Sequence, residues 1–205
     1  PERVMLAGRA VWRGGLQGQP VVLALSGIGK VAAATTATVL AERFGVERIV
    51  FTGVAGGQGA GVQVGDVAVA HGFLQHDMDA SPIFPRWELP GYGMARMPCD
   101  AGLTAMLFEA VNDYLTRGKG GFDPQNPGIG HSHASRVHQG LIVSGDRFVS
   151  TSAESGALRQ ALAAAGHEAL AVEMEGAAVA QVCHDYGLPF AAVRTISDRA
   201  DDGAH

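Results

Sequence analysis

Two short runs near the end of the chain, Ala171-Val-Glu-Met-Glu-Gly176 and Val193-Arg-Thr-Ile-Ser-Asp198, decide the predicted fold. Residues 168–172 are a short apolar run and predict a buried strand. Apolar residues at helical spacing predict a helix over 174–186, and a second apolar run predicts a strand over 189–196. The order strand, helix, strand is typical of α/β proteins.

Three acids lie at the ends of these predicted strands: Glu173, Glu175 and Asp198. In open α/β sheets, ligands bind outside the carboxyl ends of the strands, so the acids lie where a ligand is expected. Singly, each has a plainer explanation, since Glu175 could complement the dipole at the start of its helix and Asp198 could begin a loop. Together, on two strand ends, they favour a site.

Composition limits the class of protein. The chain has 205 residues, is 47% hydrophobic and carries a net charge of −5 without a basic block. A single domain is expected, and nucleic acid is not expected as a partner. No apolar run is long enough to span a membrane, and the first residues do not resemble a signal peptide. Cys99 and Cys183 are far apart in unrelated contexts, which predicts a reduced, cytoplasmic protein with Cys183 in the core.

The first third of the chain predicts strands around one helix. Residues 4–16 are typical of a β-hairpin, and 20–25 of a buried strand. Apolar residues at helical spacing predict a helix over 31–44, capped by a glycine at its end. Further strands are expected at 47–52 and 66–70, so the order predicts a parallel sheet with helical crossovers.

Two glycine-rich turns follow strands in this region, Ser26-Gly-Ile-Gly-Lys30 and Gly53-Val-Ala-Gly-Gly57. Neither has the spacing of a phosphate-binding P-loop or of a dinucleotide-binding turn. Glycine at such places indicates a close approach of the backbone to something else. The pattern leaves open whether that is a neighbouring strand or a ligand.

Residues 75–98 are irregular because their prolines exclude a helix or a central strand. Loops of this length in compact domains are usually lids, binding loops or interface segments. This one carries apolar residues that something must cover, and a contact with another subunit is the favoured interpretation: Phe84, Trp87, Tyr92 and Met97.

The second half predicts two helices, over 100–116 with Asp100 as its N-cap and over 153–165, and a strand over 137–143. Residues 118–138 are rich in Gly, Pro, Asn and His. Their three histidines, at 131, 133 and 138, fit no zinc-binding spacing, so a solvated loop is the favoured interpretation.

Six motifs occur in the order and at the spacing found in one family: Ser26-Gly-Ile-Gly-Lys-Val-Ala-Ala-Ala34, Thr52-Gly-Val-Ala-Gly-Gly57, Val64-Gly-Asp66, Gly140-Leu-Ile-Val-Ser-Gly-Asp146, Val172-Glu-Met-Glu175 and Arg194-Thr-Ile-Ser-Asp198. The chain thereby resembles the 5′-methylthioadenosine/S-adenosylhomocysteine nucleosidases of the nucleoside phosphorylase superfamily. The resemblance covers nearly all of residues 1–205, with 118–136 as an apparent insertion. It implies one three-layer α/β domain, with a central mixed, largely parallel β-sheet flanked by helices.

The resemblance also implies a reaction, cleavage of the N-glycosidic bond of an adenine nucleoside through an oxocarbenium-like sugar cation. Asp198 would protonate the leaving purine, with Ser197 orienting it. Glu175 would accept hydrogen bonds from the ribose hydroxyls, and the backbone of Met174 would lie under the sugar. This chemistry needs neither a metal nor an organic cofactor, and the family habit implies a homodimer.

The remaining site residues are also carried over from the resemblance. Phe148 would stack on the adenine while the main chain of Val149 reads its edge. Ile28 would line the pocket for the 5′-alkylthio group, and Met97 from the partner subunit would complete it. Glu173, Ala55 and Gly56 are further expected substrate contacts.

The sequence favours water over phosphate as the nucleophile. A phosphate site needs arginines and hydroxyl groups. The phosphorylases carry an arginine before the second glycine-rich turn and a hydroxyl residue within it, whereas this chain has Phe51 and Val54 there. Thr52 alone is a poor phosphate ligand.

The nucleosidases begin with a strand and a Gly-x-Met-x-x-Glu motif whose glutamate activates the water, and they end with a helix. Neither segment is found in residues 1–205, so both are expected in the full protein beyond these residues. Three functions remain open: a nucleosidase, a phosphate-dependent phosphorylase, and a nucleoside-binding relative without activity.

Overall fold

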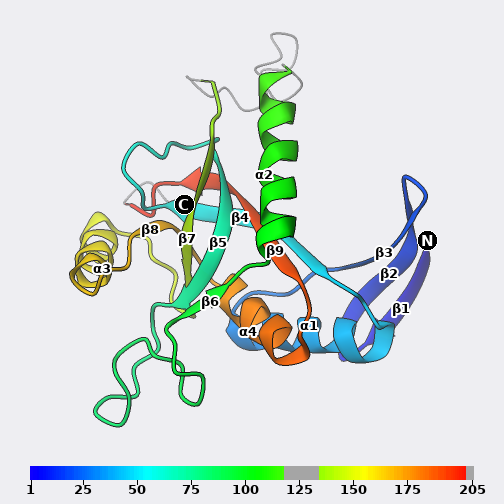
Figure 1. The fold of residues 1–205 in the computed structure, drawn as a ribbon, viewed down its shortest axis with the longest axis horizontal. Coiled ribbons are helices and arrows are strands. Elements are labelled where there is room, and N and C mark those ends of the chain that lie inside the picture. The colour runs from blue at the N-terminus through cyan, green and yellow to red at the C-terminus, as the bar shows by residue number, and fades with distance from the viewer. Residues whose placement is uncertain (118–133, 202–205) are drawn as a thin grey trace.

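The structure, a computed structural model, describes residues 1–117 and 134–201 (Figure 1). Within these residues the chain forms an α/β fold with a mixed sheet and flanking helices, as the sequence predicts. In chain order the elements are β1 (Glu2–Leu6), β2 (Arg9–Leu16), β3 (Gln19–Ala24), α1 (Lys30–Phe44), β4 (Ile49–Gly57), β5 (Val67–Gln75), β6 (Arg96–Pro98), α2 (Ala101–Thr116), β7 (Val137–Ser144), α3 (Ser152–Ala164), β8 (Ala169–Glu173), α4 (Gly176–Tyr186) and β9 (Phe190–Asp198).

The larger sheet closes on itself, which corrects the expected open, layered sheet. Its strand order is β6-β5-β7-β8-β4-β9, and β5 also pairs with β9. Strands β5, β7 and β8 are mutually parallel, and so are β4 and β9. The two groups meet through the antiparallel pairs β4–β8 and β5–β9. The sheet is therefore mixed, and its closure leaves β6 as the strand added outside the ring.

The first three strands form a separate antiparallel sheet beside α1, at the side opposite α3 in Figure 1. The hairpin expected at 4–16 is confirmed as β1 and β2. The strand expected at 20–25 is present as β3, but the predictions of burial and of a parallel neighbour are wrong. A two-residue turn at Gln17 and Gly18 joins β3 to β2, and so short a connection forces an antiparallel pair.

The helices follow the sequence closely at their ends. Gly45 ends α1 in the left-handed conformation (φ 59°), and Asp100 caps α2 by accepting a hydrogen bond from the Leu103 N–H at 2.8 Å. Helices α1 and α4 pack against each other, and small buried residues such as Ala33 and Ala177 permit the close approach. None of the helices within the described residues is long and apolar enough to cross a bilayer.

The loop over residues 75–98 is largely covered by its own chain. Trp87, Leu89 and Met97 are buried, and the Trp87 indole N–H donates to the His76 carbonyl at 3.0 Å. A subunit contact is therefore not needed to cover these side chains, although Ile83 remains exposed.

The predictions for residues 118–138 are only partly open to test. His131 and His133 lie outside the described residues, together with most of the apparent insertion. His138 lies on β7 rather than in a loop, with Nε2 2.7 Å from the buried Oδ2 of Asp66.

Candidate active site

The ends of β8, β4 and β9 meet around Gly56. Gly56 is paired with Val172 of β8 on one side and with Asp198 of β9 on the other. Strands β8 and β9 are therefore not neighbours, and they run in opposite directions on either side of β4. With strands about 4.8 Å apart, the backbones at 172 and 198 lie roughly 10 Å from each other. The strand ends that carry the predicted acids are brought together, with the unpredicted strand β4 between them.

Glu173 is used inside the protein. Its carboxylate accepts hydrogen bonds from the Gly176 N–H at 2.9 Å, from the Glu175 N–H and from the Ser144 hydroxyl. It therefore caps α4, the role that the plainer explanation gave to Glu175, whose side chain makes no capping bond. These internal bonds also argue against the prediction that Glu173 contacts substrate.

Arg194 completes this buried cluster. Its guanidinium donates to Glu173 Oε2 at 2.8 Å and to the Phe51 carbonyl at 3.2 Å, and it lies 4.1 Å from the centre of the Phe51 ring. Only 1% of the Arg194 side chain and 3% of the Glu173 side chain is exposed. Sequence reasoning missed this pair, because the partners are 21 residues apart and no local pattern links them.

Glu175 points out of the cluster to the first glycine-rich turn. Its Oε1 accepts a hydrogen bond from the Gly29 N–H at 2.8 Å. Burial, with a contribution from the nearby Glu173, raises the pKa of Glu175, although the Gly29 amide opposes this shift. The backbone of the turn after β3 thus comes close to Glu175, one of the predicted site residues.

Asp198 is held by its neighbours at the end of β9. The Ser197 hydroxyl donates to Oδ2 at 2.8 Å, and the Ala200 N–H donates to Oδ1 at 2.7 Å. The pairing of Ser197 with Asp198 is as the resemblance implies. A Cβ on Gly56 would lie 2.9 Å from Asp198 Oδ1, so only glycine leaves room there for the carboxylate.

The other predicted site residues divide by exposure. Ile28 and Phe148 are exposed apolar side chains (82% and 57%), Met174 is half-buried, and Ala55 and Val149 are buried. Residues 53–57 belong to β4 and do not form the turn that was expected. Met97 is 1% exposed and pairs with Phe73 in β5, so it is not offered to another subunit in this conformation.

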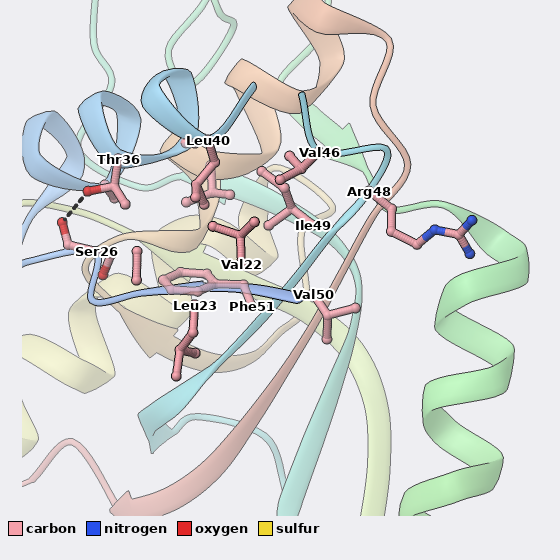
Figure 2. A pocket seen from close by; sticks show the side chains of 14 residues that line it. Val22, Leu23, Ser26, Thr36, Leu40, Val46, Arg48, Ile49, Val50 and Phe51 are labelled. Atoms are coloured by element: carbon pink, nitrogen blue, oxygen red, sulfur yellow. Dashed lines mark hydrogen bonds between the residues drawn. The ribbon is translucent and has the colours of Figure 1, made fainter. Parts of the chain in front are cut away.

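An apolar cavity of about 120 Å³ lies elsewhere, between β3, α1 and β4 (Figure 2). Its lining includes Val22, Leu40 and Ile49, and the one ionisable lining residue, Arg48, points away from it in Figure 2. None of the predicted site residues lines this cavity. Without an acid or base it offers no group for proton transfer, so the strand ends around Gly56 remain the candidate site.

Comparisons with known proteins give one consistent family. Residues 1–205 match the model of the phosphorylase superfamily. The chain is 37% identical, over 201 residues, to a 5′-methylthioadenosine/S-adenosylhomocysteine nucleosidase of Actinobacillus succinogenes, covering 97% of this chain and 76% of that protein.

Solved structures agree with this result. One is the Neisseria meningitidis nucleosidase of the same description in complex with methylthio-immucillin-A, with a TM-score of 0.81 and 35% identity, covering 99% of this chain and 78% of the other. Another is the futalosine hydrolase of Helicobacter pylori, with a TM-score of 0.79 and 30% identity, covering 99% and 77%.

Proposed function

Because this chain belongs to the phosphorylase superfamily, we propose that it hydrolyses the N-glycosidic bond of 5′-methylthioadenosine and S-adenosylhomocysteine, releasing adenine and the 5-thioribose product. The observation that carries the proposal is the position of two acids, Glu175 just after β8 and Asp198 at the end of β9, on the two strands that flank Gly56 of β4. Asp198 is held by Ser197 and Ala200, and Glu175 accepts a hydrogen bond from the Gly29 amide.

In the proposed reaction the glycosidic bond breaks with its electron pair going to the purine. Asp198 gives a proton to the free nitrogen of the five-membered ring, which neutralises the leaving base. A water molecule then adds to the anomeric carbon of the oxocarbenium-like cation and releases a proton to solvent, from which Asp198 is reprotonated. The Ser197 hydroxyl and the Ala200 amide each bind a different oxygen of Asp198, which fixes the plane of the acid.

Glu175 serves the sugar in this proposal. One oxygen accepts the Gly29 amide, and the remaining lone pairs of the carboxylate would accept hydrogen bonds from the ribose hydroxyls. Its negative charge also stabilises the developing cation. Phe148, exposed beside this region, supplies a face on which adenine can stack, and the exposed Ile28 supplies an apolar contact for the 5′ substituent.

Two cations near the site are already paired with carboxylates, which favours water over phosphate as the nucleophile. Arg194 is paired with Glu173, and Lys30 is paired with Asp77 at 2.6 Å. A phosphate ion needs cations whose charge is not already used by a carboxylate. These two pairs support hydrolysis.

Purine release from 5′-methylthioadenosine is expected to proceed at the same rate in phosphate-free buffer and in buffer with phosphate. The measurement is adenine formation, with S-adenosylhomocysteine and aminofutalosine tested in parallel to rank the substrates. An absolute requirement for phosphate would identify a phosphorylase. Nucleoside binding without adenine formation in either buffer would identify an inactive relative.

Replacing Glu175 by Gln is expected to lower kcat/KM by roughly 10- to 100-fold, because charge-assisted hydrogen bonds contribute about 1.5–3 kcal/mol.

The Glu175→Gln change should also remove a loss of folding stability that depends on pH. Since the pKa of Glu175 is raised in the folded protein, the native fold loses stability as pH rises from about 4.3, the unfolded value, through the raised folded value.

The melting temperature of the Glu175→Gln protein, measured relative to that of the native protein, should therefore rise as pH increases from about 4 to 7. Thermal unfolding of both proteins across this range measures the difference. A gain that is constant with pH, or that shrinks as pH rises, contradicts the raised pKa.

We also propose a homodimer. Ile83 is a large apolar side chain that is 82% exposed in the single chain and has no part in the proposed site, and a second copy would cover it.

A further inference from the structure

Three loops meet at one charged cluster that none of the proposed catalytic steps uses. They are the turn Ser26–Lys30, the segment Gln75–Asp77 and the segment Ser144–Val149, which we call the base loop because the proposed function places adenine on it. We propose that Lys30, His76 and Asp77 are positioning residues that hold the base loop at a fixed place relative to Glu175. The inference rests on the proposed function and names what sets the affinity for the base.

Asp77 bridges the other two loops. Its Oδ1 accepts from the Lys30 ammonium at 2.6 Å, and its Oδ2 accepts from the Asp146 N–H at 2.9 Å. Asp146 in turn accepts the Lys30 N–H at 2.7 Å. Lys30, Asp77 and Asp146 therefore close a ring of three hydrogen bonds, so none of the three loops can move without breaking one.

The Asp77 carboxylate is ionised at neutral pH. Burial alone would raise the pKa of Asp77, but the hydrogen bonds from Lys30 and from the Asp146 amide outweigh it and hold that pKa below its ordinary value. Side-chain exposure is 17% for Lys30 and 28% for Asp77. The pair is thus partly shielded from water, which makes its contacts stronger than those of a surface ion pair.

His76 contacts the base loop through its backbone and its ring. Its backbone N–H donates to the Ser144 carbonyl at 2.9 Å, and its own carbonyl accepts a hydrogen bond from the Trp87 indole. A Cβ on residue 145 would lie 2.4 Å from the His76 ring, so the ring lies directly against the backbone of Gly145. The packing of the imidazole against Gly145 therefore limits how closely the base loop can approach β5.

The same turn connects the cluster to the sugar side of the site. The amide of Gly29 binds Glu175 and the next amide, that of Lys30, binds Asp146. Two consecutive N–H groups therefore hold the ribose-binding acid and the base loop in one frame. Loosening these contacts should weaken binding of the base first, because the Asp198 carboxylate is held by the Ser197 hydroxyl and the Ala200 amide, which do not belong to the cluster.

Replacing Asp77 by Asn, or Lys30 by Met, is expected to weaken the binding of free adenine about tenfold, as expected for one lost charge-assisted hydrogen bond. The Michaelis constant for the methylthioadenosine substrate should rise by a similar factor. The kcat should change less than about threefold, and the melting temperature should fall modestly, because a partly shielded ion pair is lost. The double variant should be no worse than either single variant, because both changes break one ring. Adenine binding is measured by calorimetry, which does not depend on turnover.

Asp113→Asn is the matched control, since it removes the negative charge from an exposed 2.7 Å ion pair between Asp113 of α2 and Arg117, and it should leave adenine affinity, the Michaelis constant and kcat unchanged. Gly145→Ala tests the contact between His76 and the base loop separately, because the added Cβ would clash with the His76 ring, and it should also raise the adenine Kd. A lower melting temperature with unchanged adenine affinity would show a purely structural role and overturn the inference. Native protein that binds adenine but does not hydrolyse nucleosides would overturn the proposed function while leaving this test intact.

Discussion

Asn in place of Asp198 is expected to lower kcat for 5′-methylthioadenosine by about 10²- to 10⁴-fold, the usual contribution of a general acid. The amide cannot give a proton to the leaving purine, so the base must depart as an anion. Asn is nearly the same size, and its oxygen can still accept the Ala200 N–H that now binds Asp198 at 2.7 Å. Adenine affinity should therefore remain within a fewfold of the native value.

Steady-state kinetics and adenine calorimetry on the same preparations measure the two effects. Ser197→Ala is the informative companion, since it removes the hydroxyl that orients Asp198 while keeping the acid, and it should lose much less activity. A near-normal rate for the Asn variant would remove Asp198 from its proposed role.

The second large effect is on stability. Replacing Arg194 by Met is expected to lower the free energy of unfolding by about 3–5 kcal/mol, because it leaves the Glu173 carboxylate buried without its counter-charge. The methionine fills much of the same volume, so a cavity contributes little to the loss. Chemical denaturation of both proteins at neutral pH provides the measurement.

A Glu173→Gln/Arg194→Met double variant should recover part of the stability, since the uncompensated charge is then gone. Arg117→Met, which breaks an exposed ion pair, should cost well under about 1 kcal/mol. A loss of that small size at Arg194 would show that the other bonds to Glu173 are sufficient to hold it.

Local chemistry explains why much of the fold could be predicted. The glycine after α1 and the aspartate before α2 end and begin their helices because the signals lie within a few residues of the structure they set. The serine beside Asp198 is likewise a sequence neighbour, so their contact needs no knowledge of the fold. The hairpin at the N-terminus forms over the predicted residues, but it turns at Ala7 and Gly8, while Gly14 and Gly15 are paired within β2.

Long-range pairing explains the errors. The sequence of an apolar strand does not say which edge its neighbours will occupy, so it did not predict the separate sheet of β1–β3, the insertion of β4 between β8 and β9, or the closure through β5 and β9. The buried role of Glu173 was not predicted, for the same reason. Which of two nearby acids turns inward depended on Arg194 and Ser144, which other strands supply.

By itself, the sequence determined the α/β class, most helix and strand positions, and the two acids around which a site is proposed, because turns, caps and apolar periodicity act over a few residues. Only the tertiary structure decided that β4, with Gly56, lies between the two strands that lead to those acids, that Arg194 is neutralised by Glu173, and that Lys30 and Asp77 tie the base loop to the turn after β3. Such contacts join residues tens of positions apart, and they become definite only when closure of the sheet fixes which strand ends are neighbours.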